Sequence, residues 1–222
     1  MYWLAAFLSA GSVGIGGMFY LRYFFKEKEV EISSRQRKIF IPAACLFFAA
    51  TAALMAAFTS PLDSTVFVFA RDILMMHCLF YLAVIDFKLQ IIPNKALLVM
   101  LLAWAAISAA QIIAGENPLS LLFDSLIGGI AAGGIFFLGN LLSHNGMGMG
   151  DVKLMALAGL YLGINKVMAL IFWALALSLV TGLVLMAAKK AKIKTAIPLA
   201  PFFLAGSLIS NTLYILSGFS EV

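Results

Sequence analysis

The sequence predicts an all-α integral membrane protein, a polytopic bundle of about eight transmembrane helices with a short sixth helix and the N-terminus outside. Of its 222 residues, 64% are hydrophobic and 11% are charged, which is more apolar surface than one soluble core buries. Apolar runs of roughly 17–25 residues, enough to cross ~30 Å of hydrocarbon as a helix, recur along the chain. The longest polar stretch, residues 26–38, is too short to fold alone. We therefore expect a single membrane-embedded domain over residues 1–222.

Hydropathy and turn residues together divide the chain into eight candidate spans. They cover residues 2–25, 39–59, 66–86, 96–114, 121–142, 151–162, 167–188 and 197–217. The first positive residues follow the first apolar run rather than precede it, as expected for a span that is retained. The sixth run corresponds to only ~18 Å of helix. It is therefore either a short tilted span shielded by its neighbours or a re-entrant piece.

Positive charge is distributed unequally between the two sides of this arrangement. Alternating the loops places thirteen of the fifteen Lys and Arg residues on one side: Arg22, Lys26, Lys28, Arg35, Arg37, Lys38, Lys88, Lys95, Lys153, Lys189, Lys190, Lys192 and Lys194. That side is predicted to be cytoplasmic, with residues 26–38 as a short basic cytoplasmic loop. The net charge of +5 is thus explained by orientation in a lipid bilayer, and no nucleic-acid partner is expected.

Two carboxylates are brought to the same membrane face by these spans. Asp86 ends the third span as it reaches the cytoplasmic side, and Asp151 begins the sixth span as it leaves that side. Ionisable residues at such positions indicate function. Two carboxylates that meet tend to share one proton, which suits peptide hydrolysis: one takes a proton from water while the other polarises the scissile carbonyl. Because Asp86 lies at a helix C-terminus and Asp151 at an N-terminus, the helix dipoles predict that Asp86 is the protonated member.

Other residues near these aspartates are candidates for binding substrate or shaping the site. Gly146, Gly148 and Gly150 precede Asp151 in "GMGMGD" and allow close approach of an extended peptide, although a flexible loop is the simpler reading. Pro93 and Asn94 follow the third span and equally fit a turn that starts the fourth.

Lys88 and Lys153 each lie two residues beyond an aspartate. They either face the pair or extend to the interface as juxtamembrane lysines do.

Three sequence blocks together resemble one family. "IDFKLQIIPN" (85–94), "GMGDVKLMALAGLYLG" (148–163) and "IPLAPFFLAG" (197–206) are similar, in the same order, to the signature blocks of type IV prepilin peptidases, and the resemblance covers about residues 73–217. The GxGD element is shared with preflagellin peptidases and, more distantly, with presenilin-type intramembrane proteases. The resemblance implies that Asp86 and Asp151 are the catalytic dyad.

What the resemblance implies is an aspartyl endopeptidase in the bacterial plasma membrane with its site facing the cytoplasm. Its partners would be prepilins or pseudopilins, cut between a short basic leader and an apolar helix. Bifunctional members carry a longer cytoplasmic insertion, often with paired CxxC motifs, and methylate the new terminus. Residues 26–38 are short and contain no cysteine, so methyltransferase activity is not expected, and neither a cofactor nor a metal is assigned.

Alternatives remain open at this stage. A small proton-coupled transporter or channel with a two-aspartate relay would favour carboxylates near the bilayer midplane, and a scaffold that binds pilin-like helices without cutting them would retain the same sequence. The glycine pairs Gly129/Gly133 and Gly159/Gly163 have GxxxG spacing. They serve either internal helix packing or docking of a substrate helix.

Overall fold

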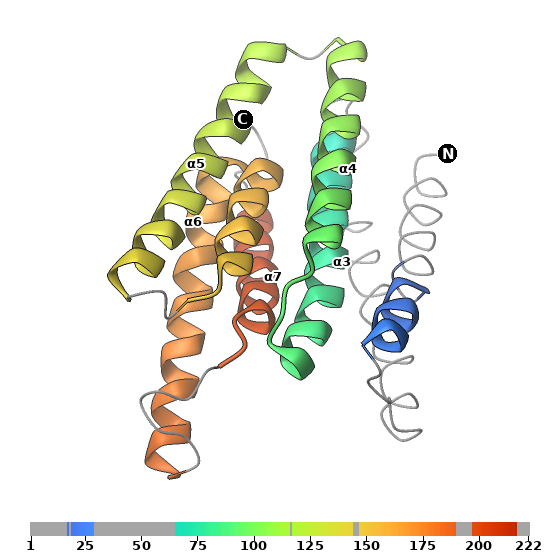
Figure 1. Cartoon of the computed structure of the whole chain (residues 1–222). Coiled ribbons are helices and arrows are strands. Elements are labelled where there is room, and N and C mark those ends of the chain that lie inside the picture. The colour runs from blue at the N-terminus through green and yellow to red at the C-terminus, as the bar shows by residue number, and fades with distance from the viewer. Residues whose placement is uncertain are drawn as a thin grey trace. The chain divides into compact units, whose positions relative to one another are not determined.

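The computed structural model describes residues 17, 19–28, 65–115, 117–143, 147–189 and 197–216, and regular secondary structure within these ranges is entirely helical (Figure 1). Residues 19–27 are helical. The longer helices are α3 (Thr65–Leu89), α4 (Asn94–Ile113), α5 (Pro118–Leu142), α6 (Met149–Ala187) and α7 (Ala200–Leu216). Three of them, α4, α5 and α6, are long and apolar enough to cross a membrane, and α7 is a shorter apolar helix.

The third to eighth predicted spans are therefore helical, and the chain is an all-α membrane protein in its described part. The second predicted span (39–59), most of the first, and most of the loop at 26–38 fall outside the described residues. The number of eight spans and the outside position of the N-terminus stay predictions.

The described residues separate into two compact units, with the boundary inside α3 between Tyr81 and Leu82. In the first unit, Gly17 lies directly against the ring of Tyr81 on α3. Phe24 and Phe25 are buried in this unit. The second unit holds the end of α3 and helices α4 to α7, and it contains both aspartates singled out in the sequence.

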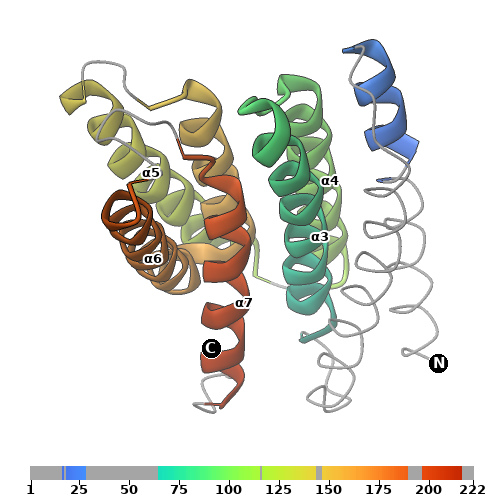
Figure 2. The same cartoon turned by 90° about the horizontal axis from the view of Figure 1, so that it is seen from below.

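Helix α6 is central in the second unit, where it packs against α5, α7 and α4 (Figure 2). Glycines allow its contact with α5 to be close. A Cβ atom on Gly128 would lie 2.6 Å from the carbonyl oxygen of Gly159, and one on Gly133 would lie 2.9 Å from the Cβ of Ala156. The GxxxG pairs of the sequence thus pack α5 and α6 against each other, which is the internal use of small residues expected in membrane helices.

A break at Gly163 divides α6 into two segments, as the sequence predicted. Gly163 has φ 72° and ψ 179°, which glycine adopts without the steric cost that a Cβ imposes. The backbone N–H of Ile164 donates to Asp124 Oδ1 at 3.2 Å, so α5 supports the break.

The chain reverses direction at this break. Residues 149–162 run antiparallel to α5, as the Gly128–Gly159 and Gly133–Ala156 contacts show. Residues 164–187 return beside α7, where Ser210 Oγ donates to the carbonyl of Lys166 at 3.1 Å. In Figure 1 the two segments of α6, gold and orange, run past each other.

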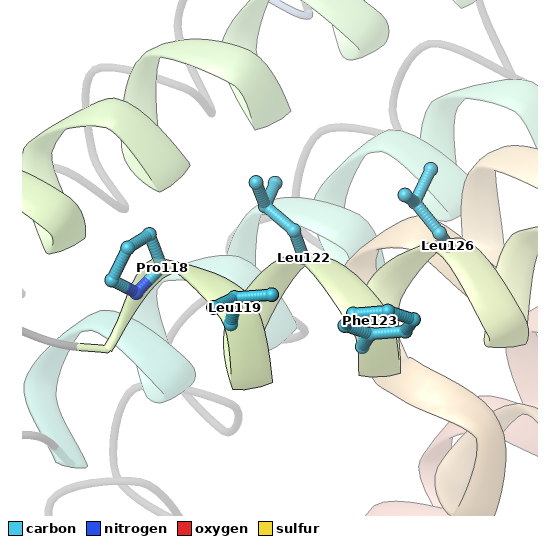
Figure 3. A pocket seen from close by; sticks show the side chains of 5 residues that line it. All are labelled: Pro118, Leu119, Leu122, Phe123 and Leu126. Atoms are coloured by element: carbon cyan, nitrogen blue, oxygen red, sulfur yellow. The ribbon is translucent and has the colours of Figure 1, made fainter.

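The outer face of α5 is strongly apolar near its start. Pro118, Leu119, Leu122, Phe123 and Leu126 line a shallow cavity of about 280 Å³ on this face (Figure 3). Leu119, Phe123 and Leu126 are exposed. Such a surface is suited to lipid chains rather than to water.

Candidate active site

Asp86 lies in the last turn of α3 and is buried, with 5% of its surface exposed. Its Oδ2 atom accepts a hydrogen bond of 2.9 Å from the backbone N–H of Ala200, the first residue of α7. The backbone amide of Leu199 also interacts with this carboxyl group. The sequence block at residues 197–206 therefore contacts the site through backbone N–H groups.

Asp151 lies in the first turn of α6, whose N-cap residue is Gly148. The backbone N–H of Asp151 donates to the carbonyl of Gly148 at 3.0 Å. Its side chain is half-buried, and Oδ1 is buried without a hydrogen-bond partner among the described residues. A Cβ on Gly148 would lie 3.2 Å from Asp151 Oδ2, so a side chain at this position would crowd the carboxylate.

The two aspartates line one cavity of about 210 Å³. Its walls are Asp86, Gln90, Ile91, Ile92, Gly148, Gly150 and Asp151. This volume accommodates several water molecules, each of which occupies about 30 Å³ in the liquid. Gly150 closes one side, because a Cβ there would lie 2.9 Å from the Cβ of Ile92. The arrangement places two carboxyl groups beside a space for water and for the backbone of a peptide.

The remaining candidate residues occupy the rim of this region. Pro93 is buried and is the N-cap residue of α4, and Asn94 is the first residue of that helix. The ammonium group of Lys153 donates to Asn94 Oδ1 at 3.1 Å, so Lys153 pairs with an amide side chain. Gly146 lies outside the described residues.

Two residues contribute to the site in ways that the sequence did not predict. Gln90 follows the last residue of α3 and has φ 53°, a left-handed conformation that is uncommon for a residue with a side chain, and residues 91 and 92 after it line the cavity. Ala200 contributes its backbone N–H, a group that every residue except proline carries. Neither the conformation of Gln90 nor the N–H of Ala200 can be recognised from the type of residue in the sequence. Within the ranges that the structure describes, no three His, Cys, Asp or Glu side chains are grouped as metal ligands would be.

Comparison with known proteins identifies a family for this chain. Residues 73–184, half of the chain, match the type IV leader peptidase family, and this range contains both aspartates. The chain belongs to the type IV leader peptidase family. It is also 29% identical over 140 residues to the prepilin leader peptidase/N-methyltransferase of Bacillus subtilis (strain 168).

That similarity covers 62% of the present chain and 53% of the relative, so this member of the leader peptidase family spans about half the length of the curated relative that it matches. No solved structure matches the chain.

Proposed function

We propose that the chain is an aspartyl endopeptidase that removes the basic leader of type IV prepilins or pseudopilins. The observation that carries the proposal is the convergence of Asp86 and Asp151, from helices far apart in the sequence, on one cavity beside Gly148 and Gly150. Membership of the leader peptidase family supports the reaction class.

In this mechanism the two carboxyl groups share one proton and act on a water molecule between them. The ionised carboxylate takes a proton from water, whose oxygen attacks the carbonyl carbon of the scissile bond. The protonated carboxyl donates a hydrogen bond to the carbonyl oxygen and stabilises the charge that develops there. The carboxyl group that took the proton from water then gives it to the nitrogen of the leaving segment as the C–N bond breaks.

The substrate class follows from where the cavity lies. Asp86 is near the end of α3 and Asp151 near the start of α6, so the pair lies at one end of the apolar helices rather than in their middle. A substrate with an apolar helix in the bilayer and a polar leader outside it would present its junction at that depth. The excess of Lys and Arg expected on this side makes it the cytoplasmic face of the bacterial plasma membrane.

The same placement supports cleavage over a two-aspartate relay. A relay for ion transport would need carboxylates near the bilayer midplane. Cleavage needs them where the leader leaves the membrane. The proposal covers peptide cleavage alone and assigns no methyl transfer, because residues 26–38 lack the longer insertion of bifunctional relatives.

The test is leader removal from a type IV prepilin that is co-expressed with the protein. Wild type is expected to release the leader, whereas Asp86→Asn and Asp151→Asn, which keep the side-chain shape, are each expected to lose at least roughly a thousandfold in rate. Glu27→Gln is the matched control, because Glu27 is an exposed carboxylate on a helix of the other unit. Normal processing by either aspartate variant would remove the dyad from the mechanism.

A further inference from the structure

We propose that the N-terminus of α7 holds Asp86 as the ionised member of the pair and leaves Asp151 as the member that carries the shared proton. This inference rests on the proposed function, in which the two aspartates act together. It assigns the general base to Asp86 and the proton donor to Asp151. It also reverses the assignment that follows when each aspartate is judged by its own helix alone.

Asp86 accepts a direct hydrogen bond from the backbone of α7. The N–H of Ala200 points at Oδ2 over 2.9 Å, and both residues are buried, with Ala200 fully so. A backbone N–H can only donate, so this oxygen must accept, and an ionised oxygen accepts more strongly than a neutral one. Ala200 is also the first residue of α7, where the helix dipole favours negative charge.

The buried Oδ1 of Asp151 has no such donor among the described residues. The backbone N–H of Asp151 itself is directed to the carbonyl of Gly148. A buried ionised oxygen without a donor loses hydration that nothing replaces, whereas a protonated carboxyl group avoids most of this cost.

The helix dipoles and the hydrogen bond from Ala200 favour opposite assignments of the proton. Asp151 sits in the first turn of α6, whose dipole favours an anion, and Asp86 sits at the end of α3, whose dipole disfavours one. The field of a helix end is a weaker influence than a charge-assisted hydrogen bond made inside the protein. Asp86 and Asp151 are the only titratable side chains that line the described cavity, and the ammonium group of Lys153 is bonded to Asn94.

The roles of the two carboxyl groups follow. Asp86, fixed by α7, takes the proton from water. Asp151, which also lines the cavity, presents its proton to the carbonyl oxygen of the scissile bond. Ala200 is a positioning residue in this scheme, because it touches Asp86 and not the substrate.

The kinetic test removes the hydrogen-bond donor to Asp86. Proline is tolerated at the first position of a helix because the N–H there has no partner within the helix. In Ala200→Pro we expect kcat for prepilin cleavage to fall by roughly tenfold to a hundredfold, as loss of a hydrogen bond to a charged group predicts, with KM changed less than about twofold. Ala200→Gly keeps the N–H and should retain kcat within about threefold. Equal loss of kcat in the two variants would overturn the inference.

A second measurement does not depend on how Ala200→Pro folds. Infrared difference spectra of the purified protein in H₂O and D₂O detect the C=O stretch of a protonated carboxyl group. We expect Asp151→Asn to lose a band that wild type shows and Asp86→Asn to keep it, because Asp86 is ionised by its α7 donor and the buried Oδ1 of Asp151 has none among the described residues. Persistence of that band in Asp151→Asn would place the proton on Asp86 and overturn the inference.

The two proposals fail differently. If wild type leaves the prepilin uncut, or if either aspartate variant cuts it normally, the proposed function fails while the infrared result still tests which aspartate carries the proton. If wild type cuts and the aspartate variants do not, equal kcat for Ala200→Pro and Ala200→Gly contradicts the role of α7 alone.

Discussion

The ammonium group of Lys153 lies 3.1 Å from the side-chain oxygen of Asn94, and this hydrogen bond joins the first turns of α6 and α4. Asp151 precedes Lys153 by two residues, and Asn94 follows the segment at 90–92 that lines the cavity. The bond therefore ties together the two sides of the candidate site.

We expect Lys153→Met to lower kcat/KM for prepilin cleavage by roughly threefold to tenfold, the effect of losing one exposed hydrogen bond at the rim of the site. Asn94→Ala should have the same effect, and the double variant should be no worse than either single one. Lys95→Met, which removes an exposed lysine next to Asn94, is the control. Additive losses in the double variant would show that Lys153 and Asn94 act separately.

Close packing of α5 on α6 predicts a strong effect at Gly159. A Cβ there would overlap the backbone of Gly128, so Gly159→Ala should reduce the free energy of unfolding by about 1–3 kcal/mol. Unfolding by SDS in mixed micelles measures this change. Gly134→Ala is the matched control, because a Cβ on Gly134 meets nothing within 4 Å. Its helix should be unchanged or more stable by up to about 1 kcal/mol. A similar loss at both glycines would contradict the packing described here.

The cavity wall at Gly150 predicts an effect on activity. In Gly150→Ala the new methyl group would press on Ile92, from which an ideal Cβ lies 2.9 Å away. We expect kcat/KM for a prepilin to fall at least about tenfold, because small displacements of reacting groups are costly. Gly139→Ala adds the same methyl group on α5 in open space and should cleave like wild type. Cleavage kinetics in vesicles compare the two, and an unimpaired Gly150→Ala would show that the site is wider than described.

The reversal at Gly163 predicts a graded pair of stability effects. Asp124→Ala removes the acceptor for the N–H of Ile164 and should cost about 0.5–2 kcal/mol, as loss of a helix cap does. Gly163→Ala should cost more, because φ of 72° disfavours a side chain and the carboxylate of Asp124 occupies the space. Denaturant unfolding of both variants gives the order. Greater loss in Asp124→Ala would mean that the cap, rather than the backbone conformation, controls the turn.

Much of the helical pattern was predictable because an apolar run long enough to cross a membrane has to form a helix. The third to eighth predicted spans are helical, and the break between the sixth and seventh lies at Gly163. Boundaries were less accurate where capping extends a helix. α5 begins at Pro118 rather than at residue 121, because Asn117 accepts a hydrogen bond from Leu119 N and Pro118 fits the first helical position.

The meeting of Asp86 and Asp151 was also predictable, since alternation of spans fixes which helix ends share a face. The contact of Ala200 with Asp86 was not. It joins residues 114 positions apart through a backbone donor, and no pattern of side chains encodes such a pairing. The partner of Lys153 was missed for a similar reason. Its bond with Asn94 depends on how α4 and α6 are placed side by side, which hydropathy does not report.

The turn at Gly163 has a mechanical consequence for the carboxylate at the other end of the same segment. Residues 149–163 pack on α5 through Ala156, Gly159 and Gly163, and Asp151 lies beyond these contacts in the first turn of the same helical segment. A tilt of this segment about its α5 contacts moves Asp151 farther than it moves the glycines. The gap between Asp86 and Asp151 therefore changes more than the packing at the glycines does.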